Sequence, residues 1–139
     1  MKEKEMITFL ETLEDGDWEV SVSAAWTVKD VVAHLVGWTE VDVGSLENID
    51  SLETFFSRRK DFDIDEYNAQ VVEKYSPIPP QELLGIWNEL LKRRAQLLAE
   101  IPREKISQDK ILNKYLLQGG NDRHTQYHYE QILSFCMQR

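Results

Sequence analysis

Two histidines four residues apart, His124 and His128, are the clearest candidates for chemistry in this sequence. They fall in the last segment with helical character, where residues at positions i and i+4 share one face and their Cβ atoms lie about 5 to 6 Å apart. Ring nitrogens on side chains so placed can bind one metal ion through bonds of about 2.0 to 2.1 Å. The third and last histidine, His34, lies far back in the chain. We hypothesise that all three bind the same ion.

The helical position of the pair supports this hypothesis. The pair lies on the same stripe as Gln131, Ile132 and Phe135, which is predicted to face the interior of the protein. Two unpaired imidazoles there would be costly, and a metal ion would satisfy both. One nitrogen from a facing helix would complete the three-ligand arrangement that is common in catalytic zinc sites. His34 is the only histidine left to supply that nitrogen.

His34 belongs to a predicted helix that starts at Thr27 and extends to about Val43. Thr27 is a candidate N-cap, and Asp30 three residues later completes the spacing of a capping box. Steps of about 100° per residue place His34 at the edge of the apolar side, so we expect its side chain to be half exposed. That apolar side consists of Val28, Val31, Val32, Leu35 and Trp38.

The spacing of apolar residues and the positions of glycine and proline define the other elements. The predicted segments are a helix over residues 2–14, a loop from Trp18 to Ala25, helices over 64–75 and 80–101, a short helix within 103–118, and a last helix capped by Asn121 or Asp122. Asp50 or Ser51 is a candidate cap for one more short helix that carries Leu52, Phe55 and Phe56.

These elements predict an all-α protein, because no segment shows the sustained alternation of a strand between hairpin turns. Four principal amphipathic helices with at least one long crossover connection indicate a four-helix bundle, either antiparallel or up-down-down-up. Periodicity does not decide between these topologies. A length of 139 residues with 42% hydrophobic residues suits one domain with a substantial core.

Charge and composition exclude several classes of function. The net charge is −9, so a nucleic-acid backbone or an anionic membrane surface would be repelled, and we expect neither as a partner. Two basic clusters, Arg58 to Lys60 and Lys92 to Arg94, are interpreted as solvated helix faces. The charged first residues do not resemble a secretory signal, and Cys136 is the single cysteine, so a cytoplasmic location is the default expectation.

Two motifs resemble those of the DinB/YfiT-like superfamily of metal-binding four-helix bundles. The stretch from Trp26 to Trp38, WTVKDVVAHLVGW, is similar to the signature of that superfamily's second helix. The stretch from His124 to Ile132, HTQYHYEQI, resembles the motif of its last helix, a histidine pair followed by Gln-Ile. The resemblance spans the chain from about Trp18 to Ile132, and it implies one DinB-like domain over residues 1–139 with short extra helices. The short first helix and the acidic insert around residues 40–63 depart from the pattern.

The resemblance implies that His34, His124 and His128 bind one divalent ion, most often zinc or nickel, with open positions facing a cavity between helices. Relatives include thiol-dependent S-transferases and isomerases that use mycothiol, bacillithiol or glutathione. Among them is the N-terminal domain of mycothiol-dependent maleylpyruvate isomerase. A resistance branch, ClbS/DfsB-like, opens an electrophilic ring by hydrolysis. A low-molecular-weight thiol is therefore a candidate cosubstrate.

Three hypotheses for function remain open. The leading one is a metal-dependent hydrolase or thiol transferase that acts on a small electrophile. A bound ion lowers the pKa of a coordinated water to about 7 and favours a coordinated thiol as thiolate, so it can serve either reaction. The alternative is a noncatalytic metal-binding or stress-response bundle. The third is a dimerising helical scaffold that needs no metal, and a homodimer is compatible with each.

Residues around the histidines are also candidates. A metal-binding imidazole usually donates its second N–H to an acceptor. The candidate acceptors are Asp30 for His34 and Gln131, Glu130 or Asp122 for the C-terminal pair, although simple capping is the preferred interpretation of Asp30. Trp38 and Tyr127 are candidates to line the cavity, against the commoner role of aromatic residues as plain core.

Overall fold

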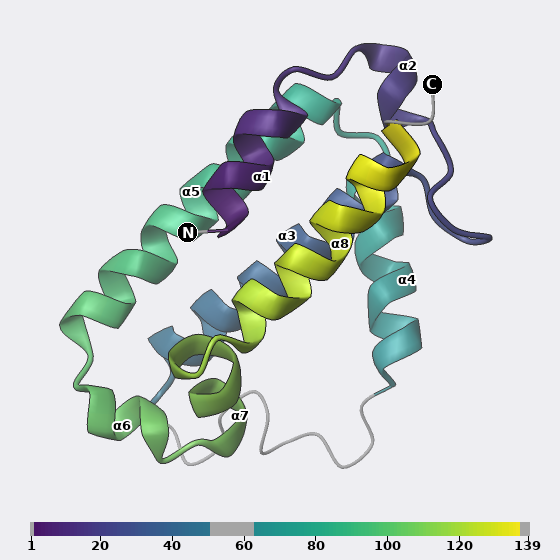
Figure 1. Ribbon diagram of the computed structural model, residues 1–139. Helices are drawn as coiled ribbons and strands as arrows, with labels where there is room; N and C mark the ends of the chain where they lie inside the picture. Colours follow the sequence, from purple (N-terminus) through teal and green to yellow (C-terminus); the bar gives the residue numbers. More distant parts are fainter. Residues whose placement is uncertain (1, 51–62, 137–139) are drawn as a thin grey trace.

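The computed structural model describes residues 2–50 and 63–136, and within them the protein is helical (Figure 1). The helices are α1 (Lys2–Leu10), α2 (Asp15–Trp18), α3 (Val28–Glu47), α4 (Ile64–Tyr75), α5 (Pro80–Glu100), α6 (Arg103–Ser107), α7 (Lys110–Leu112), the π-helical turn η1 (Asn113–Leu117) and α8 (Gly120–Cys136). The described residues include no strand, only an isolated bridge between Ser21 and Thr27. The predicted all-α fold is confirmed.

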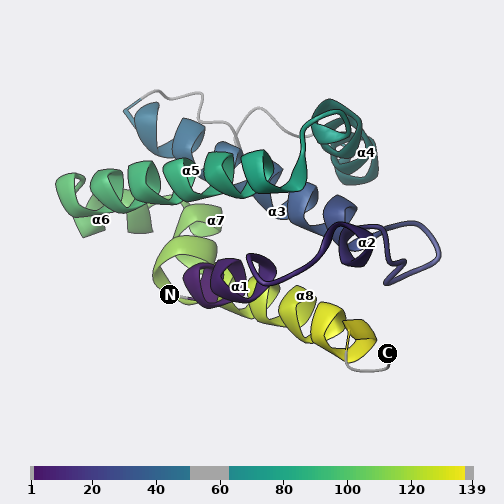
Figure 2. The same ribbon diagram turned by 90° about the horizontal axis from the view of Figure 1, so that it is seen from above.

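Helix α3 occupies the centre of the bundle, with α5 beside it and α8 crossing in front in the view of Figure 1. Seen from above, α5 covers one side of the bundle while α1 and α8 form the other (Figure 2). Side-chain contacts give the directions: α3 and α5 run parallel, and α1 and α8 run together in the opposite direction. The topology is therefore up-down-down-up, and the crossover from α3 to α5 contains α4.

Helix α3 begins where its sequence predicts. The Thr27 hydroxyl accepts from the Asp30 backbone N–H at 3.2 Å, and the Asp30 carboxylate accepts from the Thr27 N–H at 3.0 Å, which completes the capping box. The helix continues to Glu47 rather than ending near Val43. The extra turn is stabilised because Leu46 is buried in a second apolar cluster beneath α6 and η1.

Helix α4 lies unusually close to α3 at Gly37. A Cβ atom on Gly37 would lie 2.5 Å from Cγ1 of Val71, so only glycine permits this approach. The Tyr67 hydroxyl donates to the Gly37 carbonyl at 2.9 Å and fixes α4 at the same point. This contact holds the following turn of α4, which carries Asn68, beside His34.

Some predicted boundaries were wrong. The first helix ends at Leu10, and Asp15–Trp18 form a one-turn helix because the Glu14 and Asp17 side chains cap it reciprocally. The short helix predicted within residues 103–118 is divided into α6, α7 and the π-helical turn. The proposed helix after Asp50 and the cluster Arg58 to Lys60 lie outside the described residues. No helix in the described ranges is long and apolar enough to cross a membrane.

The interpretation of Lys92 to Arg94 as a solvated face was wrong for Arg94. Lys92 and Arg93 are exposed, but Arg94 is 7% exposed and turns inward between α1 and α3. Its guanidinium donates to Glu3 at 2.7 Å and to Asp42 at 3.3 Å. The ion pairs join three helices, which explains why a charged residue occupies the buried face of α5.

Candidate metal centre

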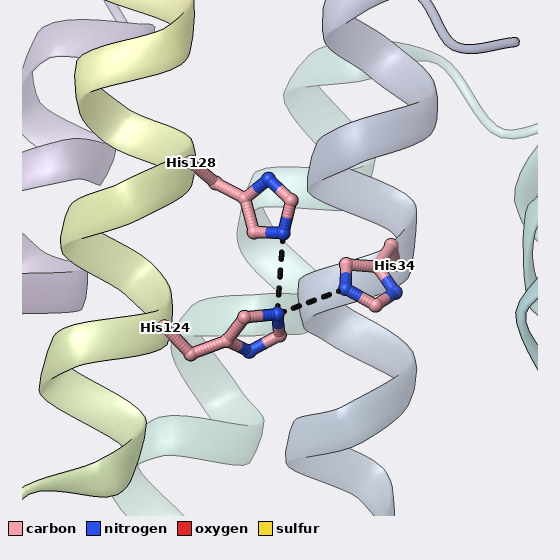
Figure 3. A group of neighbouring side chains, drawn as sticks. All are labelled: His34, His124 and His128. Atoms are coloured by element: carbon pink, nitrogen blue, oxygen red, sulfur yellow. Dashed lines mark hydrogen bonds between the residues drawn. The ribbon is translucent and has the colours of Figure 1, made fainter. Parts of the chain in front are cut away.

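The three histidines meet between α3 and α8 (Figure 3). His34 projects from α3, while His124 and His128 project from successive turns of α8 toward it. Nε2 of His124 lies 3.1 Å from Nε2 of His34 and 3.2 Å from Nε2 of His128. One nitrogen from each ring therefore points into the same small space.

Asn68 on α4 decides which nitrogen of His34 carries the proton. The indole Nε1 of Trp38 is a pure donor, and it donates to Asn68 Oδ1 at 2.9 Å, so the oxygen end of this amide faces the two rings. Nδ1 of His34 lies 3.0 Å from the same oxygen and must donate to it. Nε2 of His34 therefore presents a lone pair toward the other histidines.

Gln131 does the same for His128. The Gln131 amide nitrogen donates to the backbone carbonyl of Val22 at 3.3 Å, which places its oxygen toward the ring. Nδ1 of His128 donates to that oxygen at 3.1 Å. The candidate acceptor role of Gln131 is confirmed, and Nε2 of His128 also presents a lone pair toward the cluster.

This pattern of donors fits a cation better than it fits protons. Two lone pairs face Nε2 of His124, which carries at most one proton and cannot form a good hydrogen bond to both. Three imidazole nitrogens bound tetrahedrally at about 2.0 to 2.1 Å would lie about 3.3 Å apart. The two separations from Nε2 of His124, 3.1 and 3.2 Å, are close to that value, and all three nitrogens lie within 4.8 Å of one another. The three histidines could therefore hold a metal ion.

The protein keeps these rings neutral. Burial, with the proximity of His124 and His128, lowers the pKa of His34 to about 3. Burial and the proximity of His128 lower the pKa of His124 to about 4. Burial lowers the pKa of His128 as well, against the opposing hydrogen bond to Gln131. Neutral imidazole is the form that binds metal, so the site is ready for an ion near neutral pH.

His34 is more buried than its position on the helix predicts. Its side chain is 5% exposed rather than half exposed. The indole of Trp26 covers one side, with its ring centroid 4.8 Å from that of His34, and α4 closes another. The expected interior position of Phe135 was wrong, because this residue is 38% exposed near the end of α8, whereas Ile132 is fully buried.

A cleft of about 920 Å³ gives access to the cluster from the side of His34 and His124. Trp38, one of the two candidates for this role, lines the cleft, and Asn68 lies in the same wall. Tyr127 is 64% exposed and is not among the described residues that line the cleft. Its ring nevertheless packs against that of His128, with the two ring centroids 5.1 Å apart. A small molecule can therefore approach two of the three histidines directly.

The other expected acceptors have different partners. The carboxylate of Asp30 caps α3, in agreement with the preferred interpretation, and Glu130 accepts from Gln126 at 2.7 Å. Asn68 was missed. A signal was present, since Asn68 lies on the apolar stripe of α4 between Ile64 and Val71, where an uncharged polar residue needs a partner.

Comparison with known families agrees with this architecture. The family model of the mycothiol maleylpyruvate isomerase N-terminal domain matches residues 3–107. The chain belongs to this family. The mycothiol maleylpyruvate isomerase N-terminal domain is a DinB-like superfamily domain, so the predicted resemblance is confirmed. The matched range contains His34 and ends before α8. Searches of curated proteins and of solved structures each returned no match.

Proposed function

We propose that this protein is a divalent-metal-dependent enzyme, a hydrolase or a thiol S-transferase that acts on a small electrophilic molecule. His34, His124 and His128 are the proposed metal ligands, and zinc or nickel is the proposed ion. The observation that carries the proposal is the meeting of three Nε2 atoms, two of which have their tautomers set by Asn68 and Gln131. A small thiol is the proposed cosubstrate for the transferase reaction.

The chemistry of such a centre suits both reactions. A divalent ion, when bound, supplies Lewis acidity that favours the deprotonated form of a water or thiol. Two amide side chains fix the protons of the histidines. Asn68 keeps a proton on Nδ1 of His34, Gln131 keeps one on Nδ1 of His128, and Nε2 of each ring is left free to bind the ion. Trp26 shields the cluster on the side of the α2–α3 loop, so solvent and substrate approach through the cleft.

Metal-dependent turnover tests the proposal. Protein stripped with a chelator and then dialysed is reloaded with zinc or nickel and assayed with a chromogenic aryl halide plus a small thiol, and separately with an epoxide in water. We expect product only from the reloaded protein, and none from a reloaded His124→Ala, His128→Ala variant. Equal turnover by stripped and reloaded protein would count against a catalytic ion.

A structural role for the ion is the second candidate, favoured by the position of the cluster between α3 and α8. An ion shared by two helices contributes directly to folding. In that case chelation should lower Tm strongly, while neither thiol nor electrophile alters it and no turnover appears. A catalytic centre should show turnover in addition to any change in Tm.

A further inference from the structure

One wall of the cleft is basic, although the chain as a whole is acidic. Sixteen Lys and Arg residues stand against 25 Asp and Glu residues in the sequence. The described residues that line the cleft instead carry three cations, Lys110 of α7, Lys114 of η1 and Arg123 of α8, against one carboxylate, Asp42. The charge of the described lining residues is therefore opposite in sign to that of the whole molecule.

The three cations of this wall have no acidic partner among the described residues. Four other described lysines pair with carboxylates, as Lys74 does with Glu40 at 3.1 Å. No described carboxylate lies within salt-bridge distance of a wall cation; Arg123 donates to the carbonyl of Gln118 at 3.0 Å instead, and Lys114 lies over the ring of Tyr115. Their charge is therefore available to a ligand in the cleft.

Asp42 does not neutralise the wall. Its Oδ2 accepts from Arg94 at 3.3 Å and from Asn121 at 2.9 Å, at the back of the cleft. Burial raises the pKa of Asp42 to about 6, so the carboxylate is still largely ionised near neutral pH, where Arg94 offsets its charge. The N-terminus of α8, which begins at Gly120 on the same wall, adds a partial positive charge.

We propose that the cleft binds a small molecule through an anionic group, a carboxylate or a phosphate, held by Lys110, Lys114 and Arg123. The other end of this molecule reaches His34 and His124, which line the same cleft. The volume of about 920 Å³ admits a ligand of ordinary metabolite size. The inference rests on the proposed function in one respect only: the end of the small molecule that lies near His34 and His124 is taken as the end that reacts. The basic wall lies beyond residues 3–107, so it is not part of the family match.

Binding of simple anions to metal-free protein tests this proposal. Malonate and inorganic phosphate are titrated separately, with malonamide as the uncharged analogue of malonate. The indole N–H signal of Trp38, assigned with a Trp38→Phe variant, reports on the cleft in heteronuclear NMR spectra. We expect saturable shifts with malonate, phosphate or both, none with malonamide, and loss of binding in 1 M salt, where the Debye length is about 3 Å.

Matched variants distinguish anion binding by the wall lysines from a general effect of the protein's net charge. A Lys110→Gln, Lys114→Gln variant should bind the anion about two- to thirtyfold more weakly, because it removes two exposed charges that each contribute modestly. A Lys2→Gln, Lys92→Gln variant changes net charge equally, at solvent-accessible positions on α1 and α5 away from the cleft lining, and should bind as the wild type does. Equal binding of malonamide, equal weakening by both variants, or no saturable shift with either anion would overturn the proposal. Metal content, measured on the same proteins before the ion is removed, tests the histidine centre separately.

Discussion

Replacing Asn68 with leucine should weaken metal binding without unfolding the protein. Oδ1 of Asn68 accepts from Nδ1 of His34 at 3.0 Å and from the Trp38 indole at 2.9 Å. Without the acceptor, the Nδ1–H tautomer of His34 loses its support. Loss of such a partner typically costs 10- to 100-fold in affinity, or about 1.4 to 2.7 kcal/mol.

Competition with a chromophoric chelator measures this affinity for zinc. An Asn68→Asp variant keeps an acceptor at the same position and should retain metal binding, whereas Asn68→Leu has similar volume and no acceptor. Gln70→Leu, at an exposed position on the same helix, controls for an added apolar side chain and should bind as the wild type does. If Asn68→Leu binds zinc as tightly as Asn68→Asp, then the proposed control of the His34 tautomer is wrong.

Three further predictions concern stability. Gly37→Ala should destabilise the protein by about 1 to 3 kcal/mol in urea unfolding, because its Cβ would meet Val71 at 2.5 Å, and an unchanged midpoint would contradict the close packing of α4. Arg94→Met should cost about 3 to 5 kcal/mol by leaving buried carboxylates unpaired, whereas the exposed Arg93→Met should stay within about 0.5 kcal/mol; similar losses would refute the buried ion pairs. Metal-free protein should lose stability as pH falls from 6.5 toward 4, because the histidine pKa values are lowered in the folded state and the unfolded chain binds more protons. His34→Gln should make this dependence shallower, and an equal slope would contradict the lowered pKa.

The sequence predicts the meeting of the three histidines from two local signals together with the resemblance to the superfamily. The i, i+4 spacing places His124 and His128 on one face, and the capping box at Thr27 sets the start of the helix that carries His34. Both signals depend on neighbours within a turn of helix, and the structure retains them. The resemblance to the superfamily supplies the pairing of the two helices, which periodicity alone does not determine.

Features that depend on distant neighbours were not predictable in this way. A helical wheel describes one helix at a time. It cannot show that Arg94 is buried, because its partners, Glu3 and Asp42, come from other helices. The same limit applies to His34, whose burial depends on Trp26 and on the close approach of α4. Asn68 was missed for this reason, since its hydrogen-bond partners lie about 30 residues earlier in the chain.

The metal content of the purified protein tests the central claim most directly. Elemental analysis of wild-type protein should find about one divalent ion per chain, because the three converging imidazoles could hold one ion together. A His124→Ala, His128→Ala variant should lose the ion, while Gln126→Ala, between them on the same helix, should keep it. Equal metal content in the histidine variant and the wild type would contradict a metal centre formed by His34, His124 and His128.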